Sequence, residues 1–377
     1  MKHLLRTPFR ILAGVMAIAG VAVGGAWAHG DLTVVSWGGA YTKSQMLAYV
    51  IPYEKANGVR LDVQEYNGGL KEIRDQVEAY NVKWDVVDME LGDVLRGCQQ
   101  GLLEKIDHSV LPPAPDGTPA EQDFLPGMLP DCAVGQVIWS TVMAYNTERF
   151  KDDPPATLAD FFDTGKYPGK RGLRNSPKVN LEWALLADGV PAAQVYETLA
   201  TEAGLQRAFD KLESIRRDVI WWEDGAEPSR WLAEGEVVMS SAFNGRIYDA
   251  IADKGQPLRI VWDGQAWEYD MWAIPKRTER TPSLEAAMAF VKFATDTQRL
   301  ADQAKYISYG PVRQSSLAIL NEDIKSHLPT APANAGNAFR IDAQWWAERQ
   351  DVLERRFEHW RARRRFMDWY SRDYSPE

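Results

Sequence analysis

The chain has 377 residues and a formal net charge of −10 at pH 7, with 53 aspartates and glutamates against 43 lysines and arginines. This acidic balance argues against a nucleic-acid-binding protein, because phosphates are bound by clustered lysine and arginine side chains. The length is ample for two ordinary domains, and the 45% hydrophobic content is typical of a globular protein.

The first 28 residues have the pattern of a secretory signal peptide. Lys2, Arg6 and Arg10 form a basic start, an apolar run follows over 11–23, and Ala26-Trp27-Ala28 is a small-x-small cleavage site. An uncleaved membrane anchor is the alternative, but a span needs roughly 20 apolar residues. We therefore predict cleavage after Ala28 and a periplasmic location, and cleavage would take the formal net charge from −10 to −13.

The next hundred residues alternate strand-like and helix-like segments. We expect strands at 32–37, 59–64 and 85–89 and helices at 41–57, 70–81 and 92–100. This alternation indicates βαβ units and a parallel sheet. Ligands of such sheets bind at the carboxyl ends of the strands. The loop from Trp37 to Tyr41 and the loop at Met89-Glu90 should therefore lie on one ligand-facing edge.

The remaining elements suggest a second lobe and a return to the first. After a surface loop at 109–131, the apolar segment 134–146 leaves the first lobe. Helices are expected at 181–188, 194–203, 205–216, 228–234, 245–254, 283–295 and 297–306, and strands at 219–222, 237–241, 258–262 and 268–274. A strongly amphipathic helix over 342–366 is expected to dock on a lobe, with a partner-binding or membrane-surface helix as the alternative.

The motifs of common enzymes and metal sites are absent. The five histidines form no H-E-x-x-H arrangement, and no G-x-S-x-G, G-x-G-x-x-G or P-loop motif occurs. We expect no enzyme, no metal and no cofactor, although a hydrolase with paired carboxylates stays open. Cys98 and Cys132 predict a disulfide in an oxidising compartment, with two buried free thiols as the alternative.

Aromatic rings and carboxylates gather at predicted strand ends and turns. Trp37 and Tyr41 flank a glycine pair that lets backbone approach a ligand closely. Rings beside carboxylates make the usual cage for an ammonium or guanidinium group, although any single ring can simply be core. The further members of this set are Phe243, the Trp267, Tyr269 and Trp272 rings interleaved with Glu268 and Asp270, and Tyr309.

Seven segments carry a family resemblance that runs through nearly the whole mature chain. They are Val35–Tyr41 (VSWGGAY), Trp84–Asp88 (WDVVD), Gly101–Asp107 (GLLEKID), Trp139–Asn146 (WSTVMAYN), Gly235–Met239 (GEVVM), Phe243–Arg246 (FNGR) and Asp270–Pro275 (DMWAIP). In order and spacing the chain resembles the periplasmic polyamine-binding proteins of ABC importers, within the larger class of two-lobed extracellular solute-binding proteins.

The resemblance implies the type II periplasmic binding protein fold, an α/β fold of two lobes. Each lobe is a mixed sheet flanked by helices, the two are joined by a hinge of crossing strands, and the ligand lies between them. The expected division is 29–138 plus 272–318 for lobe 1 and 139–271 plus 319–377 for lobe 2 and the C-terminal helices.

The same resemblance implies ligand-binding roles for individual residues. It matches Trp37, Tyr41, Phe243 and Tyr309 to aromatic contacts, Asp270 to the carboxylate that grips an amino group, and Glu90 to a polar contact.

Three positions depart from the family pattern. Glu268 stands where a tryptophan is expected, and Arg246 stands near the position of a carboxylate in putrescine-type relatives. Glu182 is only a loose match to an expected acidic pair. Arg246 either neutralises Glu268 or Asp270 or meets a carboxylate of the ligand. The second option would indicate a zwitterion such as an amino or guanidino acid.

The prediction is therefore a receptor that captures a polyamine or a related cationic metabolite. We expect a monomer that passes its ligand to the permease subunits of an ABC importer and binds no nucleic acid. The alternatives are a zwitterionic or carboxylate-bearing solute in the same fold, and a secreted carboxylate-dependent hydrolase. Iron binding is disfavoured because no adjacent tyrosine pair is present.

Overall fold

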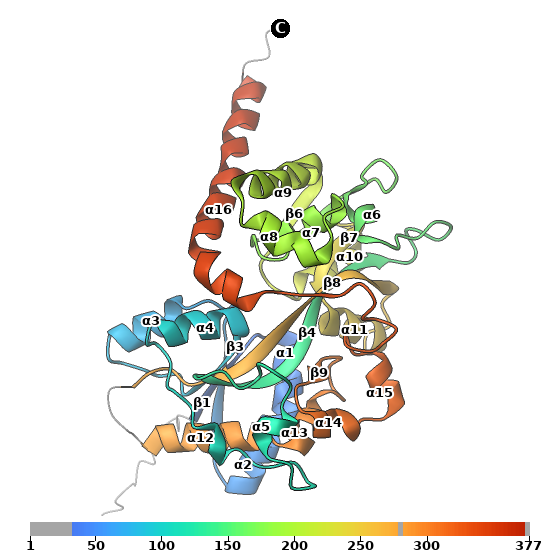
Figure 1. Cartoon of the computed structure of the whole chain (residues 1–377). Helices are drawn as coiled ribbons and strands as arrows, with labels where there is room; N and C mark the ends of the chain where they lie inside the picture. The colour runs from blue at the N-terminus through green and yellow to red at the C-terminus, as the bar shows by residue number, and fades with distance from the viewer. Residues whose placement is uncertain (1–31, 278–281, 374–377) are drawn as a thin grey trace, which may run out of the picture.

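The computed structural model describes residues 32–277 and 282–373. The predicted signal peptide, with its cleavage site after Ala28, lies outside the described residues. The described part of the chain forms two α/β lobes (Figure 1), and its strands join one sheet in the order β2-β1-β3-β8-β4-β7-β5-β6. The expected two-lobed α/β architecture is thus present.

Lobe 1 is built on the predicted βαβ units. Its parallel strands are β1 (Leu32–Ser36), β2 (Leu61–Glu65) and β3 (Val86–Glu90), with β1 in the centre. The connecting helices are α1 (Gly39–Gln45), a π-helical turn (Met46–Val50), α2 (Ile51–Asn57), α3 (Lys71–Glu78) and α4 (Leu91–Gln99). β3 is buried along its whole length, and Glu90 at its carboxyl end contacts Arg174 and Lys178 of lobe 2, as expected for the ligand-facing edge of such a sheet.

Two long antiparallel strands connect the lobes. β4 (Ala133–Asn146) and β8 (Leu258–Ala273) pair along almost their full lengths, and both run from one lobe into the other (Figure 1). The prediction of two separate strands at 258–262 and 268–274 was wrong. The strand is continuous, but its pairing with β4 jumps from Thr141↔Ala266 to Met143↔Val261, so that residues 262–265 bulge out of the ladder where the sequence suggested a break.

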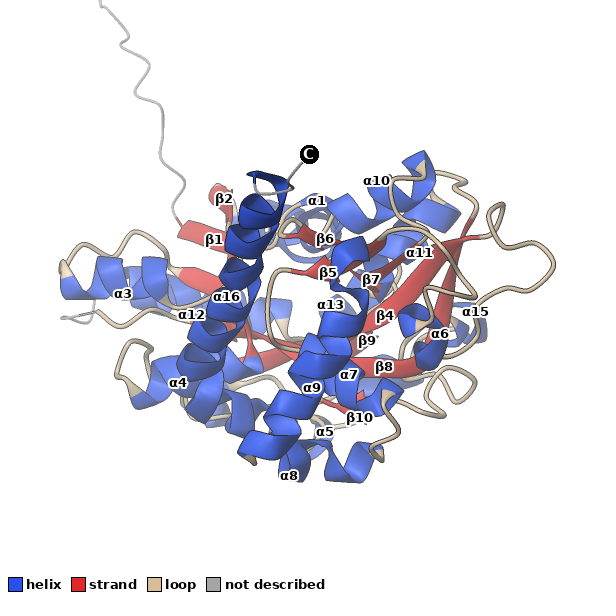
Figure 2. Ribbon diagram, turned by 90° about the horizontal axis from the view of Figure 1, so that it is seen from above, coloured by secondary structure: helices blue, strands red, loops and turns tan. Residues whose placement is uncertain are grey.

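Lobe 2 completes the sheet and adds most of its own helices. Its strands are β5 (Arg171–Arg174), β6 (Val219–Trp222) and β7 (Met239–Phe243). Its helices are α6 (Leu158–Phe162), α7 (Asn180–Ala187), α8 (Val195–Leu199), α9 (Glu202–Ile215), α10 (Glu227–Glu234) and α11 (Asn244–Ala252). Seen from above, the strands lie between helices on both sides (Figure 2).

The remaining elements return to lobe 1 or cover the surface. They are α5 (Ala120–Asp123), α12 (Pro282–Ala294), α13 (Thr297–Gln303), α14 (Gln314–Ala318), α15 (Glu322–Ser326), the short strands β9 (Gly310–Pro311) and β10 (Phe339–Arg340), and 3-10 turns at His108–Val110, Ala192–Gln194 and Arg216–Asp218. β9 pairs with β4 and β10 with β8.

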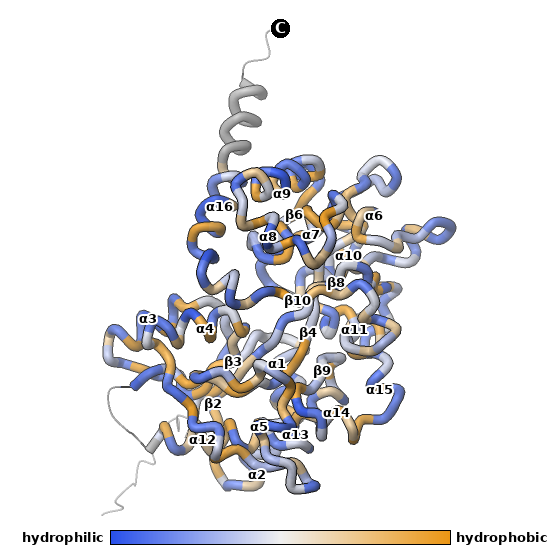
Figure 3. The backbone as a smooth tube through the Cα atoms, in the orientation of Figure 1, coloured by the Kyte–Doolittle hydropathy of each residue, from blue (hydrophilic) through white to orange (hydrophobic). Residues whose placement is uncertain are grey.

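The buried apolar side chains form separate cores in the two lobes. One core combines β1, β3 and α12 with the lobe 1 halves of β4 and β8, and two others lie among α6–α11 and β7. The hydropathy tube shows the same arrangement, with orange segments along the central strands and blue segments in the outer loops (Figure 3). Separate cores support the proposed division into lobes, because each lobe buries its own apolar surface.

The C-terminal helix α16 (Ala343–Asp373) packs on lobe 2 and also reaches lobe 1. Trp346 and Phe357 are buried in the lobe 2 core, so the predicted docking helix is confirmed. The same helix lies against α4, where Arg96 forms an ion pair with Asp351. None of the helices within the described residues is long and apolar enough to cross a membrane.

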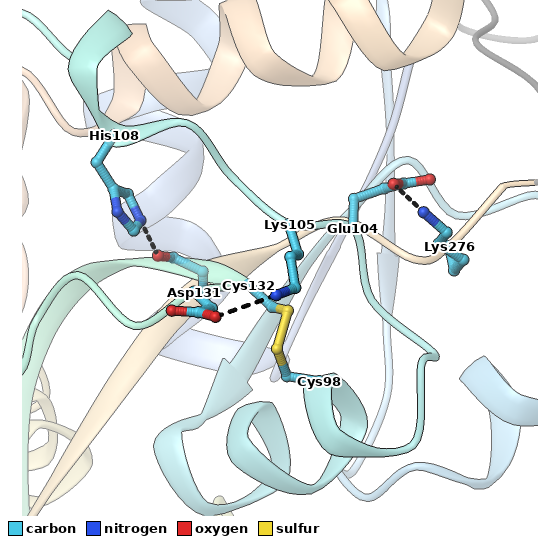
Figure 4. The surroundings of a disulfide bond; sticks show 8 residues. Cys98, Glu104, Lys105, His108, Asp131, Cys132 and Lys276 are labelled. Atoms are coloured by element: carbon cyan, nitrogen blue, oxygen red, sulfur yellow. Dashed lines mark hydrogen bonds and ion pairs between the residues drawn. A yellow bond between two sulfur atoms is a disulfide. The ribbon is translucent and has the colours of Figure 1, made fainter.

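The predicted disulfide between Cys98 and Cys132 is present (Figure 4). Their Cα atoms are 5.7 Å apart, which is within the usual range for disulfides. The bond ties the end of α4 to the residue that precedes β4, next to the ion pairs Lys105–Asp131 and Lys276–Glu104. The alternative of two free thiols is therefore wrong for this structure.

Candidate functional site

A small pocket lies between the lobes, beside the crossing of β4 and β8. Its empty volume, partly open to solvent, is about 280 Å³, and eight side chains line it. Seven of them were predicted from the sequence, and the eighth, Trp139, was not. The lining residues are Trp37, Tyr41, Glu90, Trp139, Phe243, Arg246, Asp270 and Tyr309. The structure brings these residues together, and their ligand-binding roles stay predictions.

Aromatic rings from both lobes form the walls. The ring centroids of Tyr41 and Tyr309 are 5.3 Å apart, and those of Trp139 and Phe243 are 4.9 Å apart. Tyr309 fits here because residue 245 is glycine, since a Cβ at that position would lie 2.5 Å from a ring carbon of Tyr309. Such rings offer both apolar contact and a π face to a cationic group.

Four carboxylates lie on one face of the strands that form the pocket floor. Asp88 and Glu90 are two residues apart on β3, and Glu268 and Asp270 are two residues apart on β8. Glu90 lies directly opposite Asp270 in the antiparallel ladder. Side chains two residues apart in a strand share a face. All four are buried, so each needs a partner to remain charged.

Asp88 receives hydrogen bonds from four side chains. Trp37 Nε1 donates at 3.2 Å, Tyr41 OH at 2.8 Å and Gln136 Nε2 at 2.9 Å, and Gln45 Nε2 donates as well. Burial raises the pKa of Asp88 to about 6, although these four donors favour its charged form. Asp88 thus orients Trp37 and Tyr41 from below the pocket and has little capacity left for a ligand.

Asp270 has a single partner within the described residues. Trp139 Nε1 donates to its Oδ1 at 2.8 Å. Burial, followed by the nearby charges of Asp88 and Glu90, raises the pKa of Asp270 well above its ordinary value of 3.8. A cationic group in the pocket would favour the ionised form of this carboxyl.

Glu90 and Glu268 share a cation that the sequence reasoning missed. Lys178 Nζ forms an ion pair with Glu90 and lies 2.6 Å from Glu268 Oε1, while Arg174 Nη1 lies 3.1 Å from Glu90 Oε1. Burial would raise the pKa of Glu90, but Lys178 and Arg174 outweigh it and hold the pKa at about 2. Burial and the charge of Glu90 raise the pKa of Glu268 to about 8 despite Lys178.

The structure places Glu268 and Glu182 differently from what the sequence suggested. Glu268 does not line the small pocket, since its carboxylate is turned toward Lys178. Glu182, the loose match to an acidic pair, is buried away from the pocket in lobe 2, where Trp346 Nε1 donates to it at 2.6 Å and Tyr196 OH at 3.0 Å. Neither position could be settled without the tertiary partners.

Arg246 reaches across the cleft from lobe 2 to lobe 1. It lies in the first turn of α11, which is anchored by Asn244 through hydrogen bonds with Ser140 N and Ser308 O. Its Nη2 donates to the carbonyl oxygen of Trp37 at 2.8 Å. Gly39 permits this approach, because a Cβ there would lie 2.7 Å from Arg246 Nη1.

The guanidinium of Arg246 has N–H groups that find no acceptor in the described part of the chain. Its Nε is buried without a hydrogen-bond partner in the described part of the chain, and among those residues it forms no ion pair with Glu268 or Asp270. Neutralisation of Glu268 by Arg246 was one of the two expectations, but Lys178 is the cation at Glu268. A buried N–H of this kind is costly unless a ligand or water accepts from it.

A larger polar hollow adjoins the small pocket. Its empty volume, partly open to solvent, is about 1200 Å³, and it shares Trp37 and Glu90 with the pocket. Arg174 and Lys178 line it from lobe 2. The structure describes no cluster of histidine, cysteine and acidic side chains in residues 32–277 and 282–373 that could hold a metal ion.

Four residues of the site were not predicted, and the sequence gives a usable pattern for some of them only. Asp88 has the same two-residue spacing to Glu90 that links Glu268 to Asp270, so strand periodicity alone could have found it. Trp139 lies in an apolar strand and reads as core. Arg174 and Lys178 lie more than 80 residues from Glu90 in the chain, and no sequence pattern connects them.

Comparisons with known proteins agree on the kind of molecule. A family model described as bacterial extracellular solute-binding protein matches residues 48–333. A gamma-aminobutyric acid-binding protein of Pseudomonas aeruginosa is 43% identical over 333 residues, which is 88% of this chain and 91% of that protein.

Solved structures show the same fold. The periplasmic binding protein MotA of A. tumefaciens B6 in complex with glucopine has a TM-score of 0.80 at 30% identity, covering 88% of this chain and 99% of that chain. The Atu4243-GABA receptor has a TM-score of 0.75 at 31% identity, covering 88% and 97%. A putative spermidine/putrescine ABC transporter protein of Listeria monocytogenes has a TM-score of 0.67 at 19% identity, covering 87% and 98%, and supports the fold alone.

Proposed function

This chain belongs to the bacterial extracellular solute-binding protein family, and we propose that it captures a small zwitterion with an amino group and a carboxylate, such as gamma-aminobutyric acid. The polyamine specificity expected from the sequence is not supported by the relatives named above at 30% identity or more. The proteins named at 43% and 31% identity bind gamma-aminobutyric acid. The alternative of a zwitterionic ligand is therefore the one that we adopt.

The pairing of Asp270 with Arg246 in one pocket carries this proposal. Glu90 is already neutralised by Lys178 and Arg174, and Asp88 is occupied by four donors. The pocket thus offers one carboxylate with bonding capacity and one guanidinium. A diamine would leave the buried Arg246 facing a second cation, whereas an amino acid satisfies both groups.

The ligand is held between the lobes by complementary charges. Asp270 accepts hydrogen bonds from the ammonium group, and the rings of Tyr41, Trp139 and Tyr309 surround it. Arg246 donates to the ligand carboxylate through guanidinium N–H groups other than the one that bonds Trp37 O. Because Arg246 also bonds Trp37 O across the cleft, ligand binding and lobe closure favour each other.

The cellular role follows from the family. Solute-binding proteins of ABC importers deliver small metabolites to permease subunits, and we propose that this chain does so as a periplasmic monomer after cleavage of residues 1–28. Capture and release need no bond to be made or broken. The rival hydrolase would instead show turnover of a glycan or ester substrate.

A ligand panel tests the proposal directly. The mature protein is expected to be stabilised by gamma-aminobutyric acid and not by putrescine or spermidine. At about 100 times the dissociation constant, the free energy of unfolding should rise by about 2.7 kcal/mol, which a thermal melt detects. A melting temperature raised by putrescine alone would overturn the proposed ligand class while leaving the receptor role intact.

Binding is expected to weaken as the pH falls. The pKa of Asp270 is raised in the buried pocket, and only its ionised form pairs with an ammonium group. Below that pKa the ligand must displace a proton, so the dissociation constant should rise by up to about tenfold per pH unit. Calorimetry at a series of pH values in buffers of different ionisation enthalpy should show proton release on binding. Constant affinity without proton release at every pH would contradict this role for Asp270.

A further inference from the structure

The cleft contains a lysine ammonium placed between two carboxylates. Lys178 follows β5 in lobe 2, and its Nζ contacts Glu90 at the end of β3 in lobe 1 and Glu268 on β8. The side chain of Lys178 is 5% exposed, and those of Glu90 and Glu268 are 6% and 3% exposed. A pair of buried carboxylates around one ammonium is the arrangement that would bind an amine of a ligand.

This internal ammonium lies next to the ligand pocket. Glu90 lines both the small pocket and the larger hollow, and it faces Asp270 across the β3–β8 ladder. Lys178 lines the larger hollow. A ligand whose first amine binds Asp270 would therefore find its second amine competing with Lys178 for Glu90.

We propose that Lys178 is the residue that makes this receptor reject diamines. Its ammonium occupies the carboxylate pair Glu90–Glu268 and leaves Asp270 as the acceptor for a single ligand amine. This inference rests on the proposed function and deepens it, because it names the residue that separates amino acids from diamines of the same length. Specificity then has two sources: the ammonium of Lys178 competes with a second ligand amine for the carboxylates, and Arg246 attracts a ligand carboxylate.

Loss of Lys178 changes the charge balance in a defined way. Glu90 would keep Arg174, but Glu268 would lose the only cation that contacts it within the described residues. Its second oxygen, Oε2, is already buried without a hydrogen-bond partner there. The vacated space would hold two carboxylates without their shared ammonium, and a diamine could supply one.

The experiment compares gamma-aminobutyric acid with putrescine, which has the same four-carbon chain and an amine in place of the carboxyl group. Calorimetry measures both dissociation constants for the wild type, Lys178→Ala, Lys178→Met and Lys178→Arg in the mature full-length protein. We expect the alanine variant to shift the ratio of the two constants toward putrescine by about tenfold or more. The arginine variant keeps the charge and should keep the preference for the amino acid.

Three further measurements separate specificity from general damage. Methylammonium or ethylammonium should restore the preference for the amino acid in Lys178→Ala, because it replaces the missing ammonium. Lys178→Met fills the space without charge and should shift the ratio even if the alanine variant folds poorly. Lys71→Ala, which removes an exposed lysine of lobe 1, should leave the ratio unchanged.

The outcomes distinguish the two proposals. If the wild type binds gamma-aminobutyric acid and the ratio stays constant in folded Lys178→Ala and Lys178→Met, the role of Lys178 is overturned and the proposed function stands. If the wild type binds putrescine in preference, both are overturned. A shift in the ratio that alkylammonium reverses supports both.

Discussion

Replacing Asp270 with asparagine is expected to weaken the binding of gamma-aminobutyric acid by about 100-fold or more. Truncating one partner of a buried, hydrogen-bonded charge pair typically costs about 2–5 kcal/mol, and Asp270 is 4% exposed. Asparagine keeps the shape and still accepts the Trp139 N–H with its amide oxygen, so the change isolates the charge. Isothermal titration calorimetry at neutral pH measures the loss.

The same variant should be at least as stable as the wild type in the absence of ligand. Because the folded-state pKa of Asp270 is raised, the folded protein binds this proton more tightly than the unfolded chain does. The carboxyl therefore opposes folding increasingly as the pH rises above 3.8 through the folded-state pKa. Asparagine removes that penalty, so the unliganded melting temperature should stay equal or rise.

An exposed aspartate provides the matched control. Asp75→Asn alters a carboxylate of α3 whose side chain is 59% exposed, and it should leave affinity unchanged. If Asp270→Asn bound the ligand as tightly as the wild type, another group would have to receive the ammonium. Reduced affinity together with a lowered unliganded melting temperature would point instead to structural damage.

Replacing Arg246 with methionine is expected to remove the preference for a carboxylate. A hydrogen bond to a charged group contributes about 1.5–3 kcal/mol, so the affinity for gamma-aminobutyric acid should fall by roughly 10- to 150-fold. Butylamine, which lacks the carboxylate, should lose less affinity than gamma-aminobutyric acid, because for this ligand the variant removes only the contact between Arg246 and Trp37 O. The comparison of the two ligands isolates the interaction between the guanidinium and the carboxylate.

Two controls show whether geometry or charge carries this effect. Arg246→Lys keeps the charge but loses the planar fork and the hydrogen bond from Nη2 to Trp37 O, so its affinity should lie between those of the wild type and the methionine variant. Arg259→Met changes an exposed arginine of β8 and should have no effect. Equal losses for butylamine and gamma-aminobutyric acid in Arg246→Met would assign Arg246 to lobe closure alone.

Much of the fold was accessible from the sequence because local patterns encode it. The short, fully buried strand Val86–Glu90 and the helical spacing of Trp346, Leu353 and Phe357 follow from which faces must leave water. The pairing of Cys98 with Cys132 followed from their being the only two cysteines. The error over β8 arose around Gly264, which has a φ of +67° and lies where residues 262–265 leave the ladder with β4, although the strand itself continues.

Residue type and position were also enough to find most of the pocket, since rings and carboxylates at strand ends have few purely structural reasons to gather there. Their ionisation and their partners depended on contacts between distant segments. Glu90 and Glu268 were predicted as ligand contacts, but both form ion pairs with Lys178. Arg246 donates a hydrogen bond to Trp37 O and not to a protein carboxylate. A buried charge is defined by what lies within a few ångströms of it, and for Glu90 and Arg246 those neighbours come from the opposite lobe.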